Sequence, residues 1–246
     1  MDPGSREGSP CFSSSRNSLF DSDDDEVEQQ DRESAPEATS TPIAASSTPP
    51  PIPGLFLFPS ALPIKLQHSL AAALSSSVWT SSSNQVMLFT STERPSLPSF
   101  LDPLLDLLPE ILSPVLPPPL LDLILHSPLP RQAILNLYRP GMGITPHVDL
   151  PHRYEDGIVG VSLVGSTVMD FTHDGEAHSL LLRPGDVYVL SGEARFGWKH
   201  GIAYREEDWI SDETGGELFL LKRRMRMSIT LRRMKEGANV VGDEGE

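Results

Sequence analysis

Short runs of apolar or alternating residues, separated by turn signals, follow one another through the second half of the chain. They predict strands at residues 133–138, 158–164, 167–172, 178–183, 186–191, 217–222 and 225–233. Pro184-Gly185-Asp186 is typical of a turn between two of these strands. Many short strands at regular spacing favour a mainly β fold of the jelly-roll type.

The segment before these strands predicts one more short, buried strand at residues 55–58 and helices at residues 62–74 and 100–112. The second helix is indicated by leucines at helical spacing: Leu101, Leu104, Leu105, Leu108 and Leu112. Pro103 and Pro109 weaken that helix, because proline removes a backbone donor. We expect both helices to support a sheet rather than to form a site.

The last predicted strand alternates strictly between polar and apolar residues. Its polar face carries Arg226, Ser228, Thr230 and Arg232, and its apolar face carries Met225, Met227, Ile229 and Leu231. A guanidinium that such a strand brings into the interior needs an anion, because an unpaired buried charge is costly. A dicarboxylic co-substrate, held through its distal carboxylate, would supply that anion.

His147-Val-Asp149 is the strongest candidate for chemistry. On a strand, residues two apart share one face, so both side chains are available to one metal ion. A second histidine, His200, would complete a set of two histidines and one carboxylate, which leaves half of an octahedral Fe(II) open. The alternative is a pair of surface polar residues at the end of a strand.

Several of these motifs occur in one order along the chain. Asn136-Leu-Tyr138-Arg-Pro-Gly-Met-Gly-Ile-Thr-Pro-His147-Val-Asp149, then His200, then Arg226-Met-Ser228-Ile-Thr-Leu-Arg232 resembles the AlkB family of iron- and 2-oxoglutarate-dependent dioxygenases. The resemblance covers about residues 53–235 and implies a double-stranded β-helix. It implies Fe(II) ligation by His147, Asp149 and His200. It also implies that 2-oxoglutarate contacts Asn136, Tyr138, Arg226, Arg232 and Ser228, which stands where many relatives have asparagine.

Within that family, the chain is most similar to the member that hydroxylates a wobble uridine of transfer RNA. The likeness includes Val168-Met-Asp-Phe171, Ser191-Gly-Glu-Ala-Arg195 and Trp198-Lys-His200. The resemblance therefore implies hydroxylation of a C–H bond, with a modified nucleotide in transfer RNA as one substrate. Alternatives are a protein hydroxylase or demethylase of the same fold, a nucleic-acid N-demethylase, and a non-catalytic binding module.

Three features bear on the substrate. Pro151 stands where repair members of the family carry an acidic contact to the damaged base, which disfavours base demethylation. The segment expected to form a nucleotide lid, residues 84–99, offers Phe89 but no paired aromatic residues for stacking. An acidic protein repels phosphates unless basic residues gather in a patch, and the candidates are Lys222, Arg223, Arg224, Arg232, Arg233 and Lys235.

Composition predicts one domain between two tails, at residues 1–52, 53–235 and 236–246. The first 52 residues hold 11 acidic and 3 basic residues of a chain with net charge −15, and such Ser- and Pro-rich segments are typically disordered. Cys11 is the single cysteine and the start of the chain lacks a secretory signal pattern, so a reducing compartment, cytoplasm or nucleus, is expected. Eight prolines interrupt the Leu-rich residues 97–129, so we expect no membrane span, and we expect a monomer.

Overall fold

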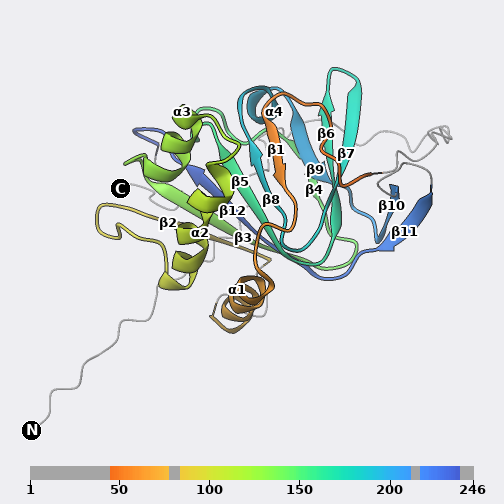
Figure 1. The fold of residues 1–246 in the computed structure, drawn as a ribbon, viewed down its shortest axis with the longest axis horizontal. Coiled ribbons are helices and arrows are strands. Elements are labelled where there is room, and N and C mark those ends of the chain that lie inside the picture. Colours follow the sequence, from red (N-terminus) through yellow and green to blue (C-terminus); the bar gives the residue numbers. More distant parts are fainter. Residues whose placement is uncertain (1–44, 78–83, 212–216, 239–246) are drawn as a thin grey trace, which may run out of the picture.

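Two antiparallel sheets that face one another form the centre of the fold (Figure 1). The computed structural model describes residues 45–77, 84–211 and 217–238. The larger sheet has the order β1-β8-β5-β12-β3-β2, with bounds Leu55–Phe58, Val187–Leu190, Ile158–Val164, Arg226–Arg233, Arg131–Tyr138 and Gln85–Phe89. The smaller has the order β4-β9-β6-β7, with bounds Ile144–His147, Lys199–Ile202, Thr167–His173 and Glu176–Leu182. This arrangement confirms the predicted mainly β jelly roll.

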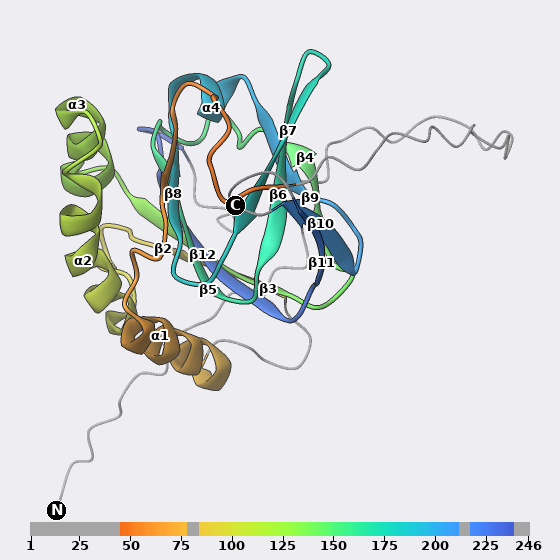
Figure 2. The same cartoon turned by 45° about the vertical axis from the view of Figure 1, so that its right-hand side comes forward.

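Helices cover the outer face of the larger sheet (Figure 2). The helical segments are α1 (Ile64–Ser77), η1 (Ser99–Leu101), α2 (Asp102–Leu112), α3 (Pro118–Leu121), η2 (Asp122–His126) and, apart from the others, α4 (Gly192–Phe196). None of the described helices is long and apolar enough to cross a bilayer. The predicted supporting helices are therefore confirmed, with slightly shifted ends.

Helix α2 persists despite Pro109 in its interior. Leu104, Leu108 and Leu112 are all buried on the face that packs against the sheet. Burial of one leucine side chain is worth about 1.5–3 kcal/mol, whereas an interior proline costs about 3 kcal/mol. Three buried leucines outweigh the proline, so packing decides the outcome.

Strand β12 lies in the middle of the larger sheet, between β3 and β5. Met227, Ile229 and Leu231 point into the core beneath the helices, as the alternation predicts. Met225 does not join that layer, because it is 45% exposed. The pairing of β12 with β3 begins at the register pair Arg226–Tyr138, and β3 ends there, so Met225 has no strand partner in β3.

The packed part of the chain begins earlier than the predicted boundary at residue 53. Ala45 is fully buried, and Ile52 lies in the core between the sheets. The amide of Ala45 donates to Trp209 O over 3.1 Å, and Ser211 N donates to Ala45 O over 2.9 Å. Residues 1–44 and 239–246, which hold most of the two predicted tails, lie outside the described residues.

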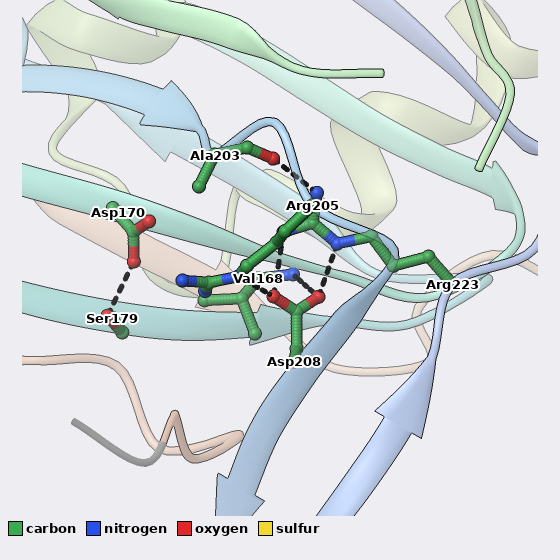
Figure 3. Close-up of polar contacts among 7 residues, drawn as sticks. All are labelled: Val168, Asp170, Ser179, Ala203, Arg205, Asp208 and Arg223. Carbon is green, nitrogen blue, oxygen red and sulfur yellow. Dashed lines mark hydrogen bonds and ion pairs between the residues drawn. The ribbon is translucent and has the colours of Figure 1, made fainter. Parts of the chain in front are cut away.

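A separate hairpin, β10 (Glu207–Ser211) with β11 (Leu218–Lys222), is attached to the smaller sheet through one buried carboxylate (Figure 3). Asp208 is fully buried and accepts two bonds from Arg223, with Nε–Oδ2 at 2.6 Å and Nη2–Oδ1 at 2.7 Å. Arg205 Nε and Val168 N also donate to it, at 2.7 and 3.3 Å. The carboxylate therefore joins three segments of the chain: β6, the residues around the start of β10, and the residues that follow β11.

We expect Asp208→Ala to lower the free energy of unfolding by about 3–5 kcal/mol, because it leaves the buried Arg223 without its anion. Arg205→Ala is the matched control. The Arg205 side chain is 44% exposed, so its removal should cost less than about 1 kcal/mol. Urea denaturation of both variants measures the difference, and equal losses would show that the network is not stabilising in this way.

Candidate metal and co-substrate site

His147, Asp149 and His200 come together at one end of the smaller sheet. Each offers a ligand atom, and these atoms lie within 4.8 Å of one another. His147 is the last residue of β4 and its register partner in β9 is His200, so strand pairing sets the two rings 4.5 Å apart between centroids. The expectation that Asp149 shares a strand with His147 is wrong, because β4 ends at His147 and Asp149 follows it in a loop.

Two buried arginines hold that loop residue in place. Arg232 Nη1 donates to the Asp149 carboxylate, and Arg195 Nη1 donates to the Asp149 backbone oxygen over 2.7 Å. Arg232 Nε also donates to Gln132 over 2.5 Å, which fixes its guanidinium. Asp149 therefore has a defined position even though no strand pairing supports it.

The environment favours the protonation states that a metal ion requires. Burial lowers the pKa of His200 to about 4 and also lowers the pKa of His147. Burial alone would raise the pKa of Asp149, but the charge of Arg232 and weaker contributions from His200 and His147 outweigh it, so the pKa lies below its usual value. At neutral pH the group is two neutral imidazoles and one carboxylate, the form that binds Fe(II).

The tautomers are compatible with ligation. His147 Nδ1 lies 2.9 Å from the Thr145 carbonyl, and a bond from Nδ1 places the lone pair of a neutral ring on Nε2. His200 Nε2 lies 3.9 Å from Asp149 Oδ2 and therefore faces the other two residues.

Arg226 is a buried cation without a carboxylate partner among the described residues. Its side chain is almost inaccessible, at 3% exposed. Nη1 donates to Ser228 Oγ over 2.8 Å and Nη2 to Ser162 Oγ over 3.4 Å, while Nε has no partner there. Its guanidinium carbon lies 5.5 Å from the centre of the Tyr138 ring. Neutral hydroxyls do not neutralise the charge, so this geometry fits an anionic ligand.

One cavity contains both the candidate metal ligands and Arg226. Seven of the residues expected at the site line it: Asn136, Tyr138, His147, Asp149, His200, Arg226 and Ser228. Arg232 does not line it, and its guanidinium donates hydrogen bonds to Asp149 and Gln132 instead. A contact between Arg232 and the co-substrate stays a prediction.

Sequence reasoning missed other residues of the cavity, notably Gln85 on β2 and Tyr188 on β8. Gln85 Nε2 donates to Asn136 Oδ1 over 2.9 Å. No motif marks either residue, since Gln85 lies in the segment expected to form a lid and Tyr188 lies in an apolar run that predicts an ordinary strand. Trp198, by contrast, is buried in the core between the sheets and serves packing there.

Two expectations about nucleic-acid contacts are corrected. The first part of the expected lid is an edge strand instead, because residues 85–89 form β2 and pair with β3, and Gln85 lines the cavity from that strand. The expected basic patch is also incomplete. Arg223 and Arg232 are buried on Asp208 and Asp149, and Arg233 is buried on the carbonyls of residues 124, 125 and 129. Carboxylate and carbonyl oxygens inside the fold hold the guanidinium groups of these three arginines.

The sheet topology, the two histidines with a carboxylate, and an unpaired arginine in the same cavity define an Fe(II)- and 2-oxoglutarate-dependent dioxygenase. The chain belongs to the 2OG-Fe(II) oxygenase superfamily, whose family model matches residues 64–232. This confirms the predicted enzyme class and the predicted cofactors, Fe(II) and 2-oxoglutarate.

Two relatives identified by sequence support the AlkB-like assignment. The chain is 40% identical over 124 residues to "tRNA (carboxymethyluridine(34)-5-O)-methyltransferase alkbh8" of Xenopus tropicalis, covering 46% of this chain and 19% of that protein. It is 28% identical over 216 residues to "Alkylated DNA repair protein ALKBH8 homolog" of Arabidopsis thaliana, covering 75% of this chain and 59% of that protein. The solved structure of OsALKBH1 matches 74% of this chain with a TM-score of 0.48 at 15% identity. The chain thus spans about a fifth of the length of the vertebrate relatives it matches.

We expect His200→Ala to weaken Fe(II) or Mn(II) binding by at least about 100-fold, because one of three ligand side chains is lost. His178→Ala is the control, since His178 lies on β7 outside the group of possible ligands. Anaerobic titration with calorimetric detection measures both affinities. Wild-type affinity in the His200→Ala protein would remove that residue from the metal site.

We expect Arg226→Lys to weaken 2-oxoglutarate binding by roughly 10- to 100-fold, because the charge remains but the planar fork is lost. Arg224→Lys, at an exposed position, is the matched control. Binding is measured on protein loaded with Mn(II), so that no turnover intervenes. An unchanged dissociation constant would assign the distal carboxylate to another residue.

Proposed function

We propose that the chain hydroxylates a C–H bond of a modified uridine at the wobble position of transfer RNA, using Fe(II), 2-oxoglutarate and dioxygen. The observation that carries the oxygenase part is one cavity with the three possible ligands and a buried arginine that has no carboxylate partner among the described residues. A non-catalytic binding module would not need both a set of metal ligands and a buried arginine that can bind a carboxylate.

The residues divide the work between binding and orientation. When bound, Fe(II) supplies the oxidative chemistry, in which 2-oxoglutarate and dioxygen become succinate and carbon dioxide and one oxygen atom enters the C–H bond. His147, Asp149 and His200 would hold the metal. Arg226, with the hydroxyls of Tyr138 and Ser228, would bind the distal carboxylate and so orient the co-substrate.

The cavity wall would limit the access of water. Ile144, Met169 and Ile202 line it from the smaller sheet, and Ile158 lines it from β5 of the larger sheet. Apolar walls lower the local dielectric, which strengthens the pairing of Arg226 with a carboxylate. They also suit a reaction at carbon rather than at a charged group.

The choice of a transfer-RNA substrate rests on similarity. Vertebrate relatives that are 36–40% identical to this chain are named for modification of carboxymethyluridine 34 in transfer RNA. Pro151 in place of an acidic base contact disfavours repair of methylated bases. Since Arg223, Arg232 and Arg233 are buried, RNA binding by the described domain should be weak, with a small salt dependence.

The protein with Fe(II) and 2-oxoglutarate should add one oxygen atom to an anticodon stem-loop RNA that carries 5-carboxymethyluridine at position 34. Mass spectrometry of the digested nucleosides measures the product, and His147→Ala is the inactive control. Single-stranded DNA with 1-methyladenine should release negligible formaldehyde.

Three outcomes would change the proposal. Demethylation of that DNA at the rate of 2-oxoglutarate turnover would move the chain to the repair branch. Oxygen incorporation into cellular protein, with RNA unchanged, would favour a protein substrate, for which the net charge of −15 is no obstacle. Absence of succinate formation from 2-oxoglutarate under all conditions would leave only a binding module.

A further inference from the structure

Tyr188 reaches the cavity because its neighbour in the sheet has no side chain. Tyr188 on β8 is the register partner of Gly160 on β5. A Cβ atom at position 160 would lie 2.0 Å from Tyr188 Cζ and 2.4 Å from its hydroxyl oxygen. The ring therefore lies directly over the backbone of Gly160, which in turn pairs with Thr230 on β12. The phenol extends from β8 across β5 toward the strand that carries Arg226.

The end of this ring faces the co-substrate side of the cavity. Tyr188, Tyr138, Arg226 and Ser228 all line it. Tyr188 is 6% exposed, so its phenol is almost entirely enclosed by the protein. Electrostatic coupling links Arg226 to both Tyr138 and Tyr188, so the guanidinium lies near both phenols. Burial raises the pKa of Tyr188 to about 12, so it is an uncharged donor at neutral pH.

A bound carboxylate can use this donor. An ionised carboxylate has about four lone-pair positions and donates nothing. Arg226 already donates from Nη1 to Ser228 and from Nη2 to Ser162. Its guanidinium alone therefore cannot donate to every lone-pair position of the two carboxylate oxygens. The phenol of Tyr188 at the cavity wall can donate one hydrogen bond to a carboxylate that binds beside Arg226.

We propose that Tyr188 is a further 2-oxoglutarate-binding residue, whose hydroxyl donates to the distal carboxylate beside Arg226, and that Gly160 is required because it gives the ring its place. This inference rests on the proposed co-substrate. The rival interpretation is that Tyr188 only packs, since its ring also contacts the apolar cluster between the sheets that includes Met169 and Leu190.

The test compares phenol-to-phenylalanine changes at two buried positions. Tyr188→Phe keeps the packing ring and removes only the hydroxyl. Tyr154→Phe is the control, because the Tyr154 hydroxyl is buried but the residue does not line the cavity. The dissociation constant for 2-oxoglutarate is measured by calorimetry on protein loaded with Mn(II), and the unfolding temperature is recorded for each protein.

We expect Tyr188→Phe to raise the dissociation constant at least about fivefold, and Tyr154→Phe to change it less than about twofold. Gly160→Ala should also weaken binding, because the added methyl group displaces the ring. The effects of Tyr188→Phe and Arg226→Lys should be non-additive, since both groups serve one carboxylate.

Wild-type affinity in Tyr188→Phe would overturn the inference and leave the residue a packing role, while the proposed co-substrate would stand. No binding of 2-oxoglutarate by the wild-type protein would overturn the proposed function, and this inference with it. Equal weakening by Tyr154→Phe would attribute the effect to general loosening of the barrel and would also contradict the inference.

Discussion

The fold around the cavity depends on which buried arginines form ion pairs with carboxylates of the chain. The C-terminal segment brings Arg223, Arg226 and Arg232 into the interior, and a buried cation that lacks an anion is costly. Asp208 neutralises Arg223, and Asp149 neutralises Arg232. Arg226 has no carboxylate partner among the described residues. Two of the three charges are therefore structural, and the third creates a binding site for a dicarboxylate.

The same pairing connects the co-substrate side to the metal side. Arg232 lies on the face of β12 that also carries Arg226, and it holds the carboxylate of Asp149, which lies outside any strand. His147 and His200 are set by the β4–β9 pairing instead. The metal site thus depends on both sheets, and it forms only when they are packed against one another.

Much of this was predictable from local pattern. The alternation of residues 225–233 predicted that Arg226, Ser228 and Thr230 of β12 face the cavity, although it also placed Arg232 there. The ordered motifs predicted the two histidines, Asp149 and Arg226 as neighbours. These signals work because they are short-range or recur in one order. Strand β9 was not predicted, and β4 was expected only at His147 and as far as Asp149. Neither run shows a clear period, and the two strands pair with one another across about 50 residues of sequence.

Partner choice was the other limit of sequence reasoning. A run of basic residues predicts a surface patch. In the fold, however, Arg223 donates to the buried Asp208 carboxylate and Arg233 donates to the Leu129 carbonyl. The Gly160–Tyr188 approach depends on a register between strands, which no local pattern encodes. The central claim, that Arg226 awaits a distal carboxylate, is tested most directly by comparing 2-oxoglutarate with 2-oxobutyrate, which lacks that group, on Mn(II)-loaded protein. We predict at least about tenfold tighter binding of 2-oxoglutarate, and equal affinities would contradict the account.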